Sequence, residues 1–327
     1  MQRRKLGSTG FDVAPLAFGG NVFGWTADEP ASFRLLDAFV GAGFNLIDTA
    51  NSYSRWVPGH AGGESETVIG NWIARRGRHD DVIVATKVGS DVGLGYRCLR
   101  RDCIMREAEA SLRRLKVEAI DLYQSHWDDD KTPFEETLDA YARLIEQGKA
   151  RAIGASNLTA PRLQEALDAG RRAGLPTYAT LQPQYNLCVR NEFEGPLAEL
   201  CIREGLGVIS YFALAAGFLT GKYRSDADLA KSPRGAGVKK FLDARGMRIL
   251  AALDRVSQRF GATPAQVSLA WLLSRPAVTA PIVSATSTDQ LDEIVASTRL
   301  SLDDDALREL DEASRDEGVA PGGPIVA

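Results

Sequence analysis

The chain has 327 residues, of which 44% are hydrophobic and 25% are charged, with a formal net charge of −4 and a pI near 5.6. These values are typical of a globular protein with a large core, and they argue against a disordered chain. The slight acidity also excludes a general affinity for nucleic acid or anionic membranes. The longest apolar run, residues 208–219, is interrupted by Ser210 and Gly217 and is too short to cross a bilayer as a helix. We expect neither a nucleic-acid partner nor a membrane partner.

The cellular compartment and the thiol chemistry are predicted from simple features. Arg3 and Arg4 are followed by polar residues instead of the apolar stretch of an export signal, so we expect a cytoplasmic protein. The cysteines are too few and too scattered for a disulfide scaffold, and buried reduced thiols are expected at Cys98, Cys103, Cys188 and Cys201. The three histidines have no ligand spacing, so we predict no metal site.

The first predicted element is a hairpin, in which residues 3–6 and 11–13 flank a turn. After it, short apolar runs rich in β-branched residues alternate with longer segments of helical period. Eight such runs are predicted as strands: residues 15–19, 44–50, 82–88, 119–126, 150–155, 178–183, 207–211 and 280–285. Helical faces recur between them, as at Ile104, Ala108, Leu112 and Leu115, and again at Phe134, Leu138, Tyr141 and Ile145.

This alternation predicts parallel strands joined by right-handed helical crossovers. Eight units favour closure into a (β/α)8 TIM barrel over an open doubly wound sheet. We expect one domain over residues 1–327, with two additions to the bare barrel. The first is an extra segment of helix and loop, residues 218–262, before the helix expected over residues 264–274 of the last unit, and the second is a C-terminal extension after Thr298.

Polar residues follow the predicted strands at the end where barrel enzymes carry their chemistry. Asp48, Lys87 and His126 end three successive strands at equal intervals, and Tyr53 follows Asp48 in the loop. Each residue alone has a structural explanation, such as a turn cap, a solvated strand end or packing. Together they suggest more, because a Lys–Asp pair beside a tyrosine is expected to lower the phenol pKa and make it a proton donor near neutral pH. His126 could then orient a carbonyl oxygen.

A series of short motifs runs through the chain in a specific order. They are Arg4-Lys5-Leu6-Gly7, Phe18-Gly19-Gly20, Asp48-Thr49-Ala50 with Tyr53, Ala85-Thr86-Lys87, Asp121-Leu122-Tyr123-Gln124 with His126, Gly154-Ala155-Ser156-Asn157, Gln182-Pro183-Gln184-Tyr185-Asn186, Leu219-Thr220-Gly221-Lys222-Tyr223, and Gln290 with Glu293. With these motifs the chain resembles an aldo-keto reductase of the bacterial type, related to the potassium-channel β-subunit branch. The resemblance implies an oxidoreductase that reduces an aldehyde or ketone with NADPH, with NADH as an alternative cofactor.

The resemblance also assigns roles to individual positions. It implies that Asp48, Tyr53, Lys87 and His126 form a catalytic tetrad with Tyr53 as the general acid. It further implies a cofactor site that runs from the nicotinamide to the adenosine end, made of Ser156, Asn157, Gln182, Tyr211, Phe212, Leu214, Ala216, Gly217, Lys222, Ser284, Thr286, Gln290 and Glu293. Arg234 is the candidate partner of the 2′-phosphate.

The sequence departs from the family pattern at three places. Phe212 replaces a small serine near the phosphates, and Ile294 replaces an asparagine near the adenine. The loop after Tyr53 carries Ser54-Arg55-Trp56 and an insertion at residues 60–63. Because Trp25, Trp56 and Trp127 each follow a strand end, we expect aromatic walls around a small-molecule carbonyl substrate, whereas Trp72 and Trp271 are expected in the core.

Several alternatives stay open at this point. The chain could be an NADPH-binding regulatory protein of the channel β-subunit type with little turnover, or an unrelated barrel isomerase or hydrolase. No Gly-x-Gly-x-x-Gly motif follows a strand, so a Rossmann site is not indicated. Ser156 and Asn157 could instead cap the next helix, Gln290 and Glu293 could be a solvated face, and Arg234 could be a free loop charge. The sequence leaves homo-oligomerisation undecided.

Overall fold

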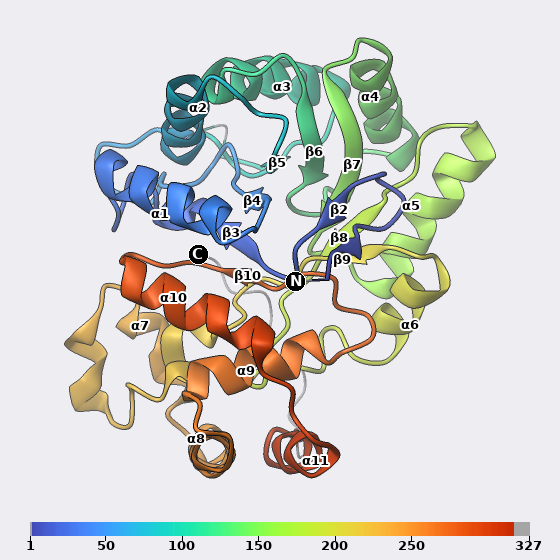
Figure 1. The fold of residues 1–327 in the computed structure, drawn as a ribbon. Coiled ribbons are helices and arrows are strands. Elements are labelled where there is room, and N and C mark those ends of the chain that lie inside the picture. Colours follow the sequence, from blue (N-terminus) through green and yellow to red (C-terminus); the bar gives the residue numbers. More distant parts are fainter. Residues whose placement is uncertain (1, 94, 317–327) are drawn as a thin grey trace.

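The computed structural model describes residues 2–93 and 95–316, and its centre is an eight-stranded parallel sheet of order β10-β3-β4-β5-β6-β7-β8-β9 (Figure 1). The strands are β3 (Ala17–Gly19), β4 (Leu46–Asp48), β5 (Ile83–Val88), β6 (Ile120–Ser125), β7 (Ala150–Ser156), β8 (Thr180–Gln182), β9 (Gly207–Val208) and β10 (Ile282–Val283). The sheet closes because Ile282 N donates to Ser210 O over 2.7 Å and Thr279 N donates to Val208 O over 2.9 Å. The predicted (β/α)8 barrel is therefore confirmed.

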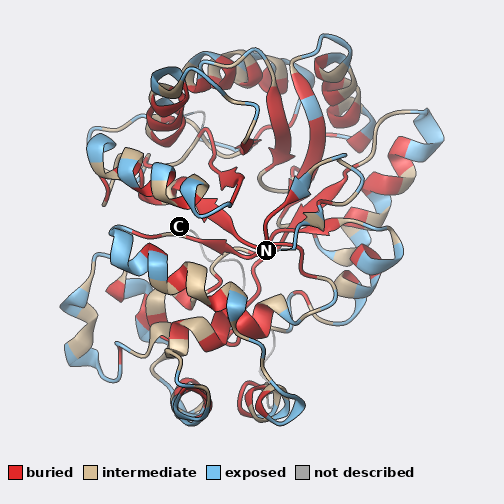
Figure 2. Ribbon diagram, in the orientation of Figure 1, coloured by how far each residue is buried: buried red, intermediate tan, exposed pale blue. Residues whose placement is uncertain are grey.

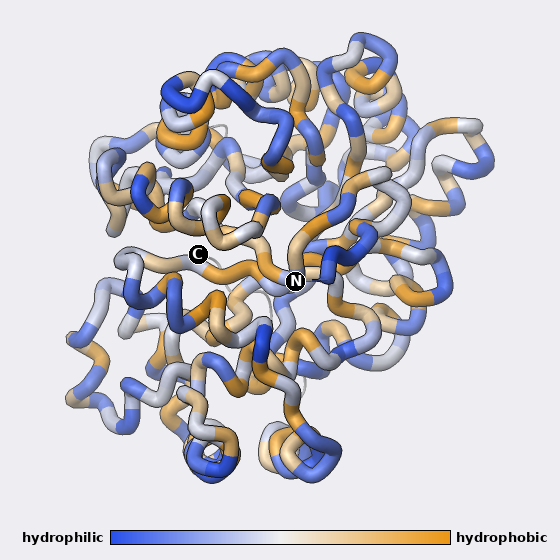
Figure 3. Tube along the Cα trace, in the orientation of Figure 1, coloured by the Kyte–Doolittle hydropathy of each residue, from blue (hydrophilic) through white to orange (hydrophobic). Residues whose placement is uncertain are grey.

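Helices surround the strands on the outside of the barrel (Figure 1). They are α1 (Glu29–Gly41), α2 (Glu64–Arg76), α3 (Arg101–Leu115), α4 (Phe134–Glu146), α5 (Ala160–Ala173), α6 (Pro196–Arg203), α9 (Pro264–Leu273) and α10 (Thr288–Ala296). Several begin at a side-chain cap predictable from sequence, such as Asp28 before α1 and the Thr263–Gln266 capping box of α9. Figure 2 shows their inner faces buried and their outer faces exposed, and Figure 3 shows hydrophobic and hydrophilic residues alternating along them.

The strands separate two apolar regions, because successive side chains of a strand point to opposite faces. One region fills the barrel interior and consists of Leu6, Val13, Ala17, Leu46, Ile83, Ala85, Leu122, Ala152, Ile209, Ala280 and Ile282. The other lies between strands and helices and includes the alternate residues Phe18, Ile47, Val84, Tyr123 and Ile153. Asp48 and Lys87 lie two residues beyond Leu46 and Ala85, so they continue the inward-facing series at the carboxyl end of the barrel.

The N-terminal hairpin is shorter than predicted, with β1 (Arg4–Lys5) antiparallel to β2 (Asp12–Val13). It belongs to the interior region through Leu6 and Val13, and it covers the amino-terminal end of the barrel (Figure 1). Seven of the eight predicted barrel strands are also shorter than expected, most of all those predicted at residues 44–50, 207–211 and 280–285. β9 and β10 each keep two residues in a ladder. Beyond β9 the pairing continues only as single contacts, such as the parallel bridge between Gln184 and Tyr211.

The two predicted additions to the barrel are present. The first contains η2 (Ala215–Thr220), η3 (Asp226–Lys231), α7 (Gly235–Val238), η4 (Lys239–Phe241) and α8 (Ala244–Phe260). The second contains η5 (Ser297–Arg299) and α11 (Asp304–Ala313), and α11 lies beside α8 (Figure 1). Within the part of the chain that the structure describes, no helix has the length and apolar character that a membrane crossing requires.

Candidate active site

A buried ion pair lies at the carboxyl end of the barrel. Lys87 Nζ donates to Asp48 Oδ2 over 2.7 Å, to Tyr53 Oη over 2.9 Å and to the carbonyl oxygen of Thr49 over 2.8 Å. The side chains of Lys87 and Asp48 are 0% and 1% exposed. Gln182 Nε2 donates to the other carboxylate oxygen of Asp48 over 2.8 Å. Every donor of the ammonium group has an acceptor, as a buried charge requires.

The electrostatics of Tyr53 differ from the sequence expectation. Burial raises the pKa of the phenol well above its usual value, and Asp48 raises it further through its charge and a 3.3 Å hydrogen bond from the phenol. Lys87 was expected to lower this pKa. That expectation was wrong, because burial and the Asp48 carboxylate, which holds Lys87 and also contacts the phenol, both raise the pKa. The phenol therefore keeps its proton at neutral pH, which is the state that a proton donor needs.

His126 lies near Tyr53 at the same end of the barrel, with the two rings edge to face and their centroids 6.0 Å apart. Burial lowers the pKa of the imidazole well below its usual range, and the charges of Lys87 and Arg97 lower it further, so the ring is neutral. Its Nδ1 lies 2.8 Å from Ser90 Oγ. The sequence prediction missed Ser90. The available signal was its place two residues after the end of β5.

A cavity of about 740 Å³ extends from this cluster along the carboxyl end of the barrel. Asp48, Tyr53 and His126 line one end of it, and Lys87 lies beneath them outside the lining. All residues that the family resemblance assigned to the cofactor line the same cavity: Ser156, Asn157, Gln182, Tyr211, Phe212, Leu214, Ala216, Gly217, Lys222, Arg234, Ser284, Thr286, Gln290 and Glu293. The structure thus brings together residues from seven separate regions of the chain.

Near Asp48, the polar residues after β7, β8 and β9 form one hydrogen-bond network. Tyr211 Oη donates to Asn157 Oδ1 over 2.7 Å, and Asn157 Nδ2 donates to the carbonyl oxygen of His126 over 2.9 Å. Ser156 Oγ donates to the carbonyl oxygen of Gln182 over 2.8 Å. The alternative that Ser156 and Asn157 cap the next helix is excluded, because α5 begins at Ala160 and neither side chain bonds to its first turn.

The loop after β9 has an unusual backbone. Phe212, Ala215, Ala216 and Gly217 all have positive φ, at 53°, 48°, 56° and 96°. Mixed right- and left-handed residues form concave backbone surfaces that bind anions, and non-glycine residues adopt such angles mostly at functional sites. The ammonium group of Lys222 lies next to this loop. A Cβ atom built on Gly217 would be only 3.5 Å from the Nζ atom of Lys222.

Two cations face the cavity without a carboxylate partner among the residues that the structure describes. Lys222 makes no ion pair through its ammonium, and Nη2 of Arg234 is buried without a hydrogen-bond partner. Arg234 stacks over Trp25 at 5.3 Å, and burial lowers its pKa. An unpaired buried guanidinium is unfavourable unless an anionic ligand completes it. This donor set fits the phosphate groups of a nicotinamide dinucleotide.

The far end of the cavity is formed by β10 and the start of α10. Ser284 Oγ lies 2.8 Å from the carbonyl oxygen of Gly19 and 2.9 Å from Asn21 Oδ1. Gln290 Oε1 accepts from Thr286 N over 2.9 Å, and Gln290 is exposed on the helix. Asn21, which the sequence prediction missed, lies directly after β3 and lines the cavity. Both Phe212 and Ile294, the departures from the family pattern, also line it.

The three loop tryptophans are arranged around Tyr53. Trp56, 39% exposed, and Trp127 line the cavity. Trp25, which was expected to line the substrate pocket, is not among the lining residues and packs against Trp56, with the rings edge to face at 5.6 Å and 84°. The tryptophans expected in the core, Trp72 and Trp271, are fully buried.

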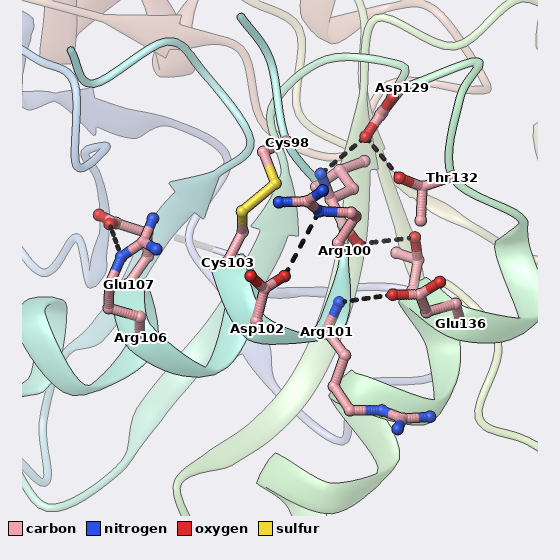
Figure 4. The surroundings of a disulfide bond; sticks show 12 residues. Cys98, Arg100, Arg101, Asp102, Cys103, Arg106, Glu107, Asp129, Thr132 and Glu136 are labelled. Carbon is pink, nitrogen blue, oxygen red and sulfur yellow. Dashed lines mark hydrogen bonds and ion pairs between the residues drawn. A yellow bond between two sulfur atoms is a disulfide. The ribbon is translucent and has the colours of Figure 1, made fainter. Parts of the chain in front are cut away.

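One expectation about the cysteines was wrong. Cys98, in the loop after β5, and Cys103, in the first turn of α3, form a disulfide with their Cα atoms 6.2 Å apart (Figure 4). The first turn of α3 packs against the preceding loop, and the five-residue spacing of the two cysteines does not by itself predict this contact. Asp129 accepts a hydrogen bond from Leu99 N over 2.9 Å and ties the same segment to the loop after β6. Cys188 and Cys201 are buried thiols as predicted, and burial raises the pKa of each to about 12.

Comparison with known proteins identifies the family. The sequence model of the Aldo/keto reductase family matches residues 15–315. The chain is 33% identical to Protein tas of Escherichia coli (strain K12), covering 95% of this chain and 97% of that protein. It is 34% identical to the Uncharacterized oxidoreductase YrpG of Bacillus subtilis (strain 168), covering 99% and 98%. It is 32% identical to a Probable voltage-gated potassium channel subunit beta of Arabidopsis thaliana, covering 90% of each chain. The chain therefore belongs to the aldo/keto reductase family and is an oxidoreductase.

Proposed function

We propose that the protein reduces an aldehyde or ketone to the alcohol with NADPH, with Tyr53 as the general acid. The observation that supports this most is the contact of a protonated phenol with the buried Lys87–Asp48 pair at the end of a long cavity. The match of the Aldo/keto reductase family model to residues 15–315, and the 30% identity to Aldo-keto reductase YhdN of Bacillus subtilis (strain 168) over 99% of this chain, support the same reaction.

The bound cofactor would supply a hydride to the carbonyl carbon. Tyr53 gives its phenolic proton to the carbonyl oxygen as negative charge develops there. Lys87 then stabilises the phenolate through its 2.9 Å contact, and Asp48 keeps the ammonium group charged and in place. Neutral His126, held at Nδ1 by Ser90, directs its other ring nitrogen to the carbonyl oxygen and orients it.

The cofactor would lie along the cavity from Tyr211 to α10. Asn157 and Gln182 would hold the nicotinamide carboxamide, and Tyr211 would contact its ring. Lys222 and the left-handed loop beside Gly217 would bind the pyrophosphate, since both present positive charge to one concave surface. Arg234 would bind the 2′-phosphate, which favours NADPH over NADH.

The test is NADPH oxidation by purified protein in the presence of 4-nitrobenzaldehyde. Tyr53→Phe should lower kcat by about 10²–10⁴-fold, because proton donation in the transition state is lost, while NADPH binding persists. Tyr96→Phe is the matched control, since Tyr96 is exposed and lines no part of the cavity. Undiminished turnover in Tyr53→Phe would overturn the assignment of the general acid.

A second candidate function comes from the plant relatives named as probable channel β-subunits, from Arabidopsis thaliana and Oryza sativa subsp. japonica. Under this alternative the chain would bind NADPH chiefly to regulate a protein partner. The two functions share the cofactor site and differ in turnover. Tight NADPH binding with negligible oxidation across a broad panel of aldehydes and ketones would favour the regulatory function.

A further inference from the structure

Three side chains form a stack from the cavity to the surface. The rings of His126 and Trp127 are stacked, with centroids 5.8 Å apart and an interplanar angle of 17°. The guanidinium carbon of Arg97 lies 4.4 Å from the centroid of the Trp127 ring. Arg97 is exposed and belongs to the loop between β5 and α3. A cation therefore lies against a wall of the cavity, close enough to His126 for its charge to act on that imidazole.

Arg97 has no anionic partner within the described part of the chain, where it forms neither an ion pair nor a hydrogen bond. Three aspartates of the adjoining loops have other partners. Asp91 pairs with Arg55, Asp128 pairs with Arg162, and Asp129 accepts hydrogen bonds from backbone N–H groups. Arginine forms its strongest contacts with carboxylates, through paired parallel hydrogen bonds. Stacking on Trp127 presents the guanidinium edge without the need for a protein carboxylate to orient it.

The cations that line the cavity itself have other partners or proposed tasks, and Lys231 pairs with Asp228 over 2.7 Å. Lys222 faces the loop assigned to the cofactor pyrophosphate, and Arg234 is the proposed partner of the 2′-phosphate, so a bound dinucleotide would neutralise both. Arg97 lies outside that groove and would keep its charge in the complex with the cofactor. The walls between Arg97 and Tyr53 are aromatic, at Trp56 and Trp127, and suit the apolar body of a substrate.

We infer that the substrate is an anionic carbonyl compound, with a carboxylate or a similar anion on an apolar or aromatic body, and that Arg97 selects it. The carbonyl lies at Tyr53 and His126, the body lies between the tryptophans, and the anion lies at the guanidinium. This inference rests on the proposed function, because it names the substrate class of the same site.

The experiment compares two aldehydes that share a ring and differ in charge, 4-carboxybenzaldehyde and methyl 4-formylbenzoate. With NADPH at low ionic strength, kcat/KM should favour the carboxylate by about fivefold or more, as expected for a charge-assisted contact at a partly exposed site. The preference should shrink near 1 M salt, where the screening length is about 3 Å. Arg97→Gln should bring the ratio close to one, and Arg97→Lys should retain part of it.

Arg113→Gln is the matched control, since Arg113 is exposed on α3 and, unlike Arg97, does not stack on the cavity-lining ring of Trp127, and its ratio should equal that of the wild type. A wild-type ratio near one, or an unchanged ratio in Arg97→Gln, would overturn the inference while leaving carbonyl reduction intact. If neither aldehyde is reduced, the proposed function fails instead. In that case a binding experiment still tests the anion site. The dissociation constants of 4-carboxybenzyl alcohol and of its methyl ester are measured in the presence of NADP⁺, from the quenching of tryptophan fluorescence. Equal dissociation constants for the two alcohols would refute it.

Discussion

The ammonium nitrogen of Lys87 lies 2.9 Å from the phenolic oxygen of Tyr53, and the carboxylate of Asp48 contacts both groups. The same three side chains therefore carry the proposed proton transfer and a buried charge pair in the barrel core. Chemistry and stability are linked at this point, because a change to any one of them leaves a buried charge or a hydrogen-bonding group without its partner.

Lys87→Met should destabilise the protein by about 3–5 kcal/mol, because it leaves the Asp48 carboxylate buried and uncompensated. Adding Asp48→Asn should restore part of this loss, so the two changes will not be additive. Urea unfolding measures the free energies. Lys5→Met is the control, since the Lys5–Asp12 pair is exposed and its loss should change stability by less than about 1 kcal/mol. Equal losses in the two variants would contradict the prediction.

The protein should lose stability in mild acid through His126. The pKa of this imidazole in the folded protein lies well below its usual value of 6.5, because of burial and then the charges of Lys87 and Arg97. Below pH 6.5 the unfolded chain takes up a proton there and the folded protein does not. Unfolding is therefore favoured by up to about 1.4 kcal/mol for each pH unit until the folded pKa is reached. His126→Gln should remove this slope below pH 6.5 in urea unfolding. A wild-type slope in His126→Gln would argue against the prediction.

Arg234→Ala should weaken NADPH binding by about tenfold or more, because a charge-assisted contact to phosphate is lost, and should weaken NADH binding much less. Lys222→Ala should weaken both cofactors, since the pyrophosphate is common to them. Dissociation constants from tryptophan quenching give the comparison. If Arg234→Ala affects NADPH and NADH equally, Arg234 is not the partner of the 2′-phosphate.

The Cys98–Cys103 disulfide predicts a specific labelling result. In the unfolded, unreduced protein, iodoacetamide should modify two of the four cysteines, and after reduction it should modify all four, as counted by intact mass. Replacing both Cys98 and Cys103 by serine should lower the free energy of unfolding by about 2 kcal/mol, because the cross-link restricts a short loop of the unfolded chain. Four modified cysteines without reduction would show that the bond is absent in solution.

Much of the fold followed from local patterns. The alternation of apolar runs and helical faces predicted the barrel, since parallel strands buried on both faces require such runs. The strand ends were less predictable, because β9 and β10 each form a two-residue ladder where strands of five and six residues were predicted. Pairing depends on the neighbouring strand, which local sequence does not contain.

The residues proposed for the cofactor site came from motifs and line one cavity, but their contacts could not be predicted. The packing of Trp25 against Trp56 and the placement of Arg234 over Trp25 both depend on how separate loops pack. Ser90 and Arg97 carried no motif, and their contacts with His126 and Trp127 arise only when the loops after β5 and β6 meet.

The sequence by itself determined the barrel and the set of residues at its carboxyl end, because residue periodicity and strand order act along the chain. Only the tertiary structure decided the state of those residues. The phenol of Tyr53 keeps its proton because Asp48 and burial act on it together, and Cys98 meets Cys103 because a helix start folds back on its loop. Burial, nearby charges and the packing of a helix on a loop depend on which residues are close in three dimensions. They determine the pKa of Tyr53 and the Cys98–Cys103 bond, and the spacing of residues along the sequence does not.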